Sequence, residues 1–201
     1  MCWNAEVSLQ SFLIGVSAII IGKYNGLSTH MTLFMLSIVS MQLIEYIVWS
    51  NMEDKNINRL ASYSAFLLLC LQPLAAIFTL PKKYYYPFLY MFIMFLLICI
   101  IFDRNTPDAF RIYKAENGHL AWNWIKNNAK HRIYTFFYLL FILIPLIISA
   151  QWGFLVFSSI VLFFSLYNYL ESNTWGSMWC WIVNYGVVGV CTYQTIQNNM
   201  K

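Results

Sequence analysis

Long apolar runs separated by short polar connections dominate the order of residues along this chain. Seven of these runs approach the roughly 20 residues that a helix needs to cross a bilayer. They cover approximately residues 5–23, 29–51, 57–80, 84–103, 132–149, 152–170 and 175–196. The pattern predicts an all-α fold: a polytopic membrane bundle of about seven transmembrane helices, forming a single domain over residues 1–201.

The long loop at residues 104–131 separates the fourth and fifth runs. Thr106 and Pro107 suit the N-cap and first turn of a helix, and Gly118 suits the residue just after a helix end. We therefore expect this loop to carry a short interfacial helix. The apolar residue Phe110 would lie against the lipid headgroups.

The composition supports a membrane protein. Hydrophobic residues make up 60% of the 201 residues and charged residues only 10%, whereas soluble domains carry about 25% charged residues. The lipid bilayer is therefore the expected partner. The net charge of +4 is spread over the loops, so no nucleic-acid-binding surface is expected.

Lys and Arg residues divide unevenly between the two sides of the predicted bundle. The side that holds the N-terminus has eight of them in its loops: Lys55, Arg59, Arg104, Arg111, Lys114, Lys126, Lys130 and Arg132. The other side has four: Lys23, Lys82, Lys83 and Lys201. The positive-inside rule then predicts a cytoplasmic N-terminus for this integral, multi-pass protein.

Glu45 lies in the apolar stretch MQLIEYIVW of the second predicted span. Gln42, Glu45 and Trp49 have the spacing i, i+3, i+7, which places them on one helical face. An acid inside a membrane is costly, so this face should point into the bundle. No Lys, Arg or His lies in the middle of any predicted span, so we expect Glu45 to be neutral there. It either donates a structural hydrogen bond or titrates with a ligand.

Counting along the helices places more polar and aromatic side chains in the same half of the bundle, on the N-terminal side. The candidate ligand-binding set is Glu45, Gln42, Gln72, Glu6, Asn168, Glu171, His119, Trp122, Trp179 and Asn184. This set predicts a polar vestibule with an acidic floor. Simpler interpretations remain open. Glu6 and Glu171 fit charges at the headgroup level, and His119 fits a solvated loop residue. Gln72 and Asn184 fit hydrogen-bonded bridges between helices.

Five short stretches of the chain form a recognisable set: MCWNAEVS, QLIEYIVW, LQPLAAIF, GHLAWNW and SMWCWIV. Together they resemble an uncharacterised family of multi-pass membrane proteins, a domain of unknown function whose members begin Met-Cys-Trp-Ser. The matching residues are Cys2, Trp3, Glu45, Gln72, Pro73, His119, Ala121, Trp122, Trp179 and Cys180. Asn4 stands where the family has Ser. The resemblance implies a shared fold and no known activity.

The long loop lacks the cysteines that are associated with the family. A loop cross-linked in relatives would lie outside the cytoplasm, which opposes the orientation that the Lys and Arg residues predict.

Cys2 is a separate candidate, because removal of the initiator Met would expose its thiol and α-amine near Trp3 and Glu6. Such a group fits a metal or nucleophile site, or an acylation site at the membrane interface. The sequence indicates no other catalytic residue, metal ligand or cofactor, and it does not indicate an oligomeric state.

Three kinds of function are compatible with these observations. The favoured one is binding or translocation of a small cation, proton or amine, with aromatic walls around an ammonium group. The second is a membrane-embedded hydrolase or lipid-modifying enzyme that uses Glu6, Glu45, Glu171 and His119, although no HExxH, GxSxG or paired-Asp motif is present. The third is a structural or assembly protein of a cellular or viral membrane.

Overall fold

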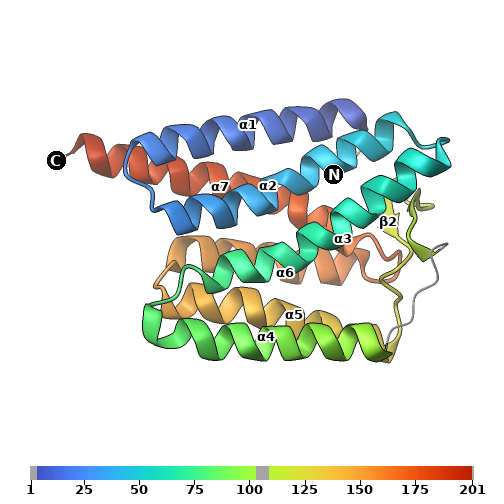
Figure 1. Ribbon diagram of the computed structural model, residues 1–201. Helices are drawn as coiled ribbons and strands as arrows, with labels where there is room; N and C mark the ends of the chain where they lie inside the picture. Colours follow the sequence, from blue (N-terminus) through green and yellow to red (C-terminus); the bar gives the residue numbers. More distant parts are fainter. Residues whose placement is uncertain (1–3, 103–108, 201) are drawn as a thin grey trace.

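The computed structural model describes residues 4–102 and 109–200, and these residues form seven helices in one bundle (Figure 1). The helices are α1 Ala5–Tyr24, α2 Thr29–Ser50, α3 Lys55–Ile77, α4 Lys82–Phe102, α5 Ala129–Ile148, α6 Trp152–Tyr169 and α7 Trp175–Asn199. They coincide with the seven predicted apolar runs to within a few residues. The all-α fold class is confirmed.

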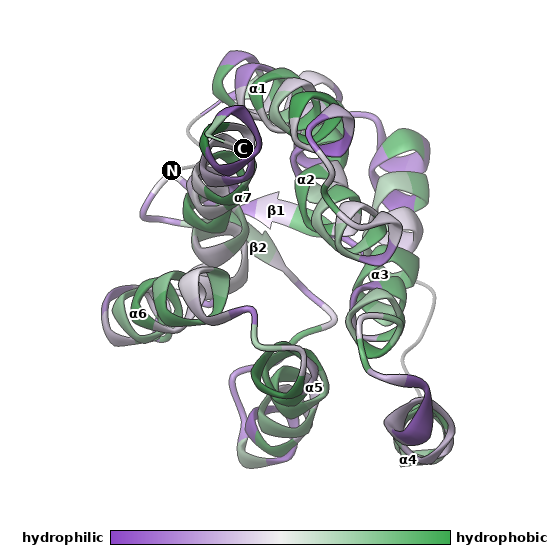
Figure 2. Ribbon diagram, turned by 90° about the vertical axis from the view of Figure 1, so that its left-hand side faces the viewer, coloured by the Kyte–Doolittle hydropathy of each residue, from purple (hydrophilic) through white to green (hydrophobic). Residues whose placement is uncertain are grey.

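Six of the described helices, α1 to α6, are long and apolar enough to cross a membrane. Helix α7 is longer but carries more amide side chains, and it is not in this set. Many large apolar side chains are exposed on the bundle, among them Ile20, Ile160 and Phe163. Hydrophobic residues, drawn in green, occur along the helices (Figure 2). So much exposed apolar surface fits a multi-pass membrane protein.

Short polar side chains fix the start of four helices. Each accepts a hydrogen bond from a backbone N–H of the first turn, as an N-cap residue does. These caps are Asn4 of α1, Ser28 of α2, Asp54 of α3 and Asn128 of α5. Each cap is the last residue before its helix begins.

Helix α2 lies in the middle of the bundle and packs against α1, α3 and α7. Its side chains Phe34, Met35, Val39 and Met41 are fully buried. Helix α4 is the opposite case: it packs against α3 and α5 at the edge of the bundle, and Phe92 is its single buried residue (Figure 2). The packed core therefore belongs to α1, α2, α3 and α7 more than to α4.

Helices α1, α2 and α7 approach one another closely around Gly15. A Cβ atom at Gly15 would lie 2.8 Å from Val39 Cγ1 of α2, and it would also collide with Asn184 Oδ1 of α7. Asn184 Nδ2 donates a 2.6 Å hydrogen bond to the Ser11 carbonyl of α1. A small residue and a buried amide together join three helices, as is common inside membranes.

The loop between α4 and α5 contains a β-hairpin. Strand β1 Ile112–Lys114 pairs antiparallel with β2 Leu120–Trp122, with Ile112 opposite Trp122. The expectation of a short interfacial helix is wrong for the described part of this loop. Residues Ala115 to Gly118 form the hairpin turn, in which the Gly118 N–H donates to the Ala115 carbonyl at 2.9 Å and Gly118 has a φ of +83°, a conformation that favours glycine. The expected helix start at Thr106 and Pro107 lies outside the described residues.

The hairpin lies across one end of the bundle (Figures 1 and 2). This end, which we call the N-terminal side, is where α1, α3, α5 and α7 begin. Buried Asn58 of α3 holds the hairpin, since its Nδ2 donates to the Ile112 carbonyl at 2.8 Å and its Oδ1 accepts from the Ile112 N–H at 3.1 Å. Ser177 Oγ of α7 donates to the Leu120 carbonyl at 3.0 Å. Both strands are therefore tied to helices.

Substitution of Gly15 with Ala is expected to lower the free energy of unfolding by about 1 to 3 kcal/mol, because the added methyl group forces α1 away from α2 and α7. Gly189 of α7 is the control, since a Cβ there meets no atom within 4 Å, so Gly189→Ala should leave stability unchanged or slightly raised. Thermal unfolding of both variants in the same detergent measures the difference. Equal melting temperatures for the two variants would contradict the close approach.

Substitution of Asn58 with Ala is expected to cost about 2 to 4 kcal/mol, because it leaves the buried N–H and carbonyl of Ile112 without their partner. The hairpin should detach first, so limited proteolysis within residues 109–128 should become faster. Asn56 is exposed in the same helical turn, which makes Asn56→Ala the matched control. A hairpin equally resistant to protease in both variants would show that Asn58 does not hold it.

Candidate functional site

A pocket of about 580 Å³ lies between α3, α4, α5, α7 and the loop on the N-terminal side. We call it the aromatic pocket. Its lining residues are mostly aromatic or aliphatic: Phe66, Leu69, Cys70, Phe92, Phe95, Leu96, Cys99, Ile100, Phe110, Trp122, Trp124, Ile125, His131, Tyr134, Thr135, Tyr138, Trp175, Gly176, Trp179 and Cys180. It lies in the half of the bundle where the sequence predicts a vestibule, but its wall is far more apolar than predicted.

A stack of rings covers the pocket at the hairpin. Tyr63 stacks on Phe110 with centroids 4.5 Å apart, Phe110 on Trp124 at 5.7 Å, and Trp124 on Trp122 at 5.8 Å. Trp122 also lies against α7, where a Cβ at Gly176 would be 3.4 Å from its ring. Because Asn58 fixes the hairpin that carries Trp122, the roof of the pocket is tied to both α3 and α7.

One wall of the aromatic pocket carries hydrogen-bonding groups. Tyr138 of α5 donates its hydroxyl hydrogen to Gln72 Oε1 of α3 at 2.5 Å, and Gln72 Nε2 donates to the Ser37 carbonyl of α2 at 3.2 Å. The thiols of Cys70 and Cys180 lie close enough to Tyr138 for electrostatic interaction, and all three residues line the pocket. This wall offers a few directional groups within an apolar surface.

Glu45 and Gln42 are both fully buried on one face of α2. Gln42 Nε2 donates to Glu45 Oε2 at 2.9 Å. Glu45 also lies near Cys180 of α7, whose side chain lines the aromatic pocket. The face of α2 that the spacing predicts to point inward is therefore the buried one, and Glu45 lies near the pocket without lining it.

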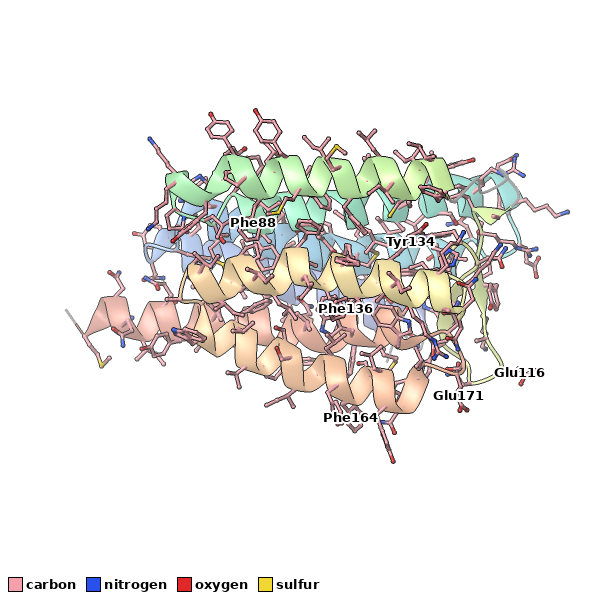
Figure 3. The ribbon with its side chains drawn as sticks, turned by 90° about the horizontal axis from the view of Figure 1, so that it is seen from below. Phe88, Glu116, Tyr134, Phe136, Phe164 and Glu171 are labelled. Carbon is pink, nitrogen blue, oxygen red and sulfur yellow. The ribbon has the colours of Figure 1, made fainter. Side chains whose placement is uncertain are left out.

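The predicted acidic floor is not formed. Glu6, Asn168 and Glu171 are all exposed and do not line the aromatic pocket. Glu6 accepts a hydrogen bond from Gln10, and Asn168 donates to the Phe164 carbonyl of its own helix. Glu171 projects from the hairpin end of the bundle (Figure 3). These residues lie at helix ends, where a charge or amide can reach water, so only Glu45 of the three carboxylates is buried.

The remaining candidates have separate roles. Trp122 and Trp179 line the pocket, and Trp179 Nε1 donates to the Ser158 carbonyl of α6 at 3.2 Å. His119 is buried beside the hairpin, with its ring 5.6 Å from that of Tyr169 in an edge-to-face contact. Asn184 is the amide that bridges α7 and α1. His119 is therefore not a solvated loop residue. Asn184 and Gln72 bridge helices, as the simpler interpretation expects.

The candidate set from the sequence omits Tyr138, although a signal for it exists. His131, Thr135 and Tyr138 recur at i, i+4 and i+7 along α5, so these polar side chains share one face of the helix. All three line the aromatic pocket. In addition, Tyr134 lies between α4 and α5, with its ring 6.5 Å from that of Phe95 (Figure 3). This polar face of α5 marks the pocket better than the exposed carboxylates do.

The described residues do not bring a metal-ligating set together: within 4–102 and 109–200, no group of three His, Cys, Asp or Glu side chains is placed to hold a metal ion. Glu6, Glu45, Glu171 and His119, the set considered for acid–base chemistry, are divided between exposed helix ends and separate buried positions. Cys2 lies outside the described residues.

Comparison with known proteins identifies no relative of this chain. No family model matches the chain, and no curated protein or solved structure is significantly similar to it. The resemblance to an uncharacterised membrane family therefore stays a prediction, and the chemistry of the aromatic pocket is the remaining guide to function.

Proposed function

We propose that this multi-pass membrane protein binds a small amphipathic molecule in the aromatic pocket. The observation that carries the proposal is a space of about 580 Å³ with an aromatic roof, apolar walls and one hydrogen-bonding side. Ligand pockets usually have volumes of about 300 to 1,000 Å³, and they combine apolar walls with a few placed polar groups. The aromatic pocket has both properties.

The polar group of the ligand would lie beside Tyr138 and Cys180, with its apolar part against α4. Tyr138 is oriented by its hydrogen bond to Gln72. The faces of Trp122 and Trp179 suit an ammonium group as well as an alkyl group. Buried Glu45 lies near Cys180 and supplies a carboxyl group on this side of the pocket. These features support an amine at the head of an apolar molecule rather than a bare cation or proton.

Helix α4 supports entry of this molecule from the bilayer. It forms one wall of the pocket through Phe92, Phe95 and Leu96, yet Phe92 is its one buried side chain. Its contacts with α5 are mainly ring contacts, such as Phe92 with Phe141 at 5.2 Å, and the hydrogen bond from Lys130 Nζ of α5 to the Phe102 carbonyl at 3.4 Å is exposed. A wall held by such contacts separates more readily than one joined by buried hydrogen bonds. Exchange with lipid would therefore take place beside α4.

The N-terminal side of the bundle is proposed to face the cytoplasm. In the described part of the chain this side carries Lys55, Arg59, Arg111, Lys114, Lys126, Lys130 and Arg132, and the opposite side carries Lys23, Lys82 and Lys83. An excess of Lys and Arg in the connections is typical of the cytoplasmic side. The aromatic pocket would then lie in the cytoplasmic half of the membrane.

Filling the pocket with Leu96→Trp is expected to abolish ligand-induced stabilisation. Decylamine and decanol are suitable probes, added to protein in lipid nanodiscs while the melting temperature is measured. A probe at 100 times its Kd should stabilise the wild type by about 2.7 kcal/mol. Leu97 is exposed on the same helix, so Leu97→Trp should retain the full shift. Loss of the shift in both variants, or in neither, would contradict binding in this pocket.

Substitution of Glu45 with Gln is expected to weaken decylamine binding about tenfold and to leave decanol binding unchanged. The reason is that a carboxylate favours an ammonium over a hydroxyl, whereas the amide keeps the shape of the buried side chain. The decanol measurement is the internal control for folding. Unchanged affinity for both probes would assign Glu45 a purely structural role and leave the apolar pocket itself in place.

A further inference from the structure

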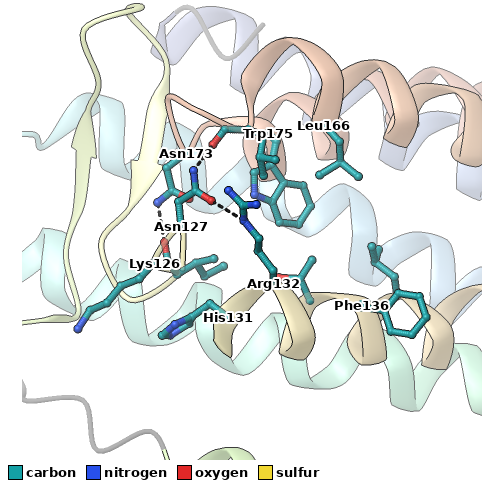
Figure 4. Close-up of a pocket in the computed structure, with 12 residues that line it drawn as sticks. Lys126, Asn127, His131, Arg132, Phe136, Leu166, Asn173 and Trp175 are labelled. Carbon is teal, nitrogen blue, oxygen red and sulfur yellow. Dashed lines mark hydrogen bonds between the residues drawn. The ribbon is translucent and has the colours of Figure 1, made fainter. Parts of the chain in front are cut away.

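A second cavity, of about 210 Å³, lies between α5, α6 and the loop at the same end of the bundle (Figure 4). It shares the wall formed by Ile125, His131, Thr135 and Trp175 with the aromatic pocket. Its other side is different, because it carries the cationic side chains of Lys126 and Arg132. We call it the cationic pocket.

The guanidinium of Arg132 is fixed at the mouth of the cationic pocket. Its Nε donates a 3.0 Å hydrogen bond to Asn127 Oδ1, and Asn127 Nδ2 donates to the Leu170 carbonyl of α6 at 3.1 Å. The guanidinium therefore lies between Asn127 and Trp175 (Figure 4). Its Nη1 and Nη2 groups donate to no other residue within 4–102 and 109–200, which leaves a planar pair of donors for an anion.

The surroundings strengthen the preference for an anion. Lys126 and Arg132 flank the start of α5, where the positive end of the helix dipole lies, and the first turn of α5 contains no acidic residue. Cations at this end are repelled by the helix dipole, and a bound anion would offset that repulsion. The carboxylate of Glu171 follows Leu170 but projects from the end of the bundle and does not line the cavity (Figure 3).

The floor of the cationic pocket is apolar and continues into the membrane-spanning part. Phe136 and Leu139 of α5 face Leu166 and Leu170 of α6 across it. Phe136 is 58% exposed, so the floor opens towards the lipid side of the bundle. A soluble anion would gain nothing from this surface, whereas an acyl chain would be buried there.

We propose that the cationic pocket binds an anionic phospholipid, with the phosphate at the guanidinium of Arg132 and the start of an acyl chain along Phe136 and Leu166 (Figure 4). This proposal does not rest on the ligand proposed for the aromatic pocket. It lies at the level where headgroups begin, since α5 starts and α6 ends beside it. Cations at this level attract the anionic lipids of a cytoplasmic leaflet.

Native mass spectrometry of delipidated protein titrated with phosphatidylglycerol tests the proposal. Wild type should bind phosphatidylglycerol about tenfold more tightly than phosphatidylcholine, and added salt should weaken the binding. Arg132→Gln should weaken phosphatidylglycerol binding about fivefold and reduce the preference for phosphatidylglycerol over phosphatidylcholine. Arg132→Lys, which keeps the charge, should restore part of the affinity and shows that loss of folding is not the cause.

Arg111→Gln is the matched control, because Arg111 is an exposed cation on the same side that lies outside the cationic pocket. Its phosphatidylglycerol affinity should equal that of wild type. An equal loss in Arg111→Gln and Arg132→Gln would overturn the proposal, since general charge would then explain the binding. Soluble glycerol 3-phosphate is the last probe: if it binds as tightly as phosphatidylglycerol, the site takes a free phosphate compound and the lipid assignment is wrong.

Discussion

Helices inside a bilayer gain little from burying apolar surface against one another, because lipid tails are as apolar as their side chains. The bundle therefore depends on close contacts at small residues and on buried hydrogen bonds between helices. Asn184 joins α7 to α1, Trp179 joins α7 to α6, and Tyr138 joins α5 to Gln72 of α3. Each bond ties a side chain of one helix to a different helix. These polar contacts join α7 to α1 and α6, and α5 to α3.

The aromatic pocket lies beside α4, where buried hydrogen bonds between helices are few. Helix α4 contains Tyr, Lys and Cys but no Asn, Gln, Ser or Thr, so it has few groups that can form buried hydrogen bonds with a neighbour. It is held by contacts of Phe92 and Phe95 with Phe141 at 5.2 and 5.6 Å. The other helices are drawn together by polar bonds, while α4 stays at the edge. Space for a ligand remains along α4, and the hairpin that Asn58 secures covers the end of that space.

The sequence predicts part of this arrangement well, because hydropathy over about 20 residues reports directly on a spanning helix. It also identifies the inward face of α2, since Gln42 and Glu45 would otherwise meet lipid. The sequence does not distinguish the hairpin from a helix end, because Gly118 suits either one. The acidic floor was wrong because position along a helix does not show whether Glu6 or Glu171 points inward. The sequence does not predict the aromatic pocket, because the pocket depends on the distance of α4 from α3 and α5.

The two proposed sites are not independent in space, because Thr135 and Trp175 form a wall between them. A phospholipid against one side of this wall would restrict the side chains that a ligand meets on the other side. If one ligand has already restricted these side chains, the binding of a second ligand costs less conformational entropy. This coupling has the same size in both directions. Lipid bound at Arg132 would thus favour ligand in the aromatic pocket by stiffening its wall. The shared residues, rather than any direct contact between the two ligands, would carry that effect.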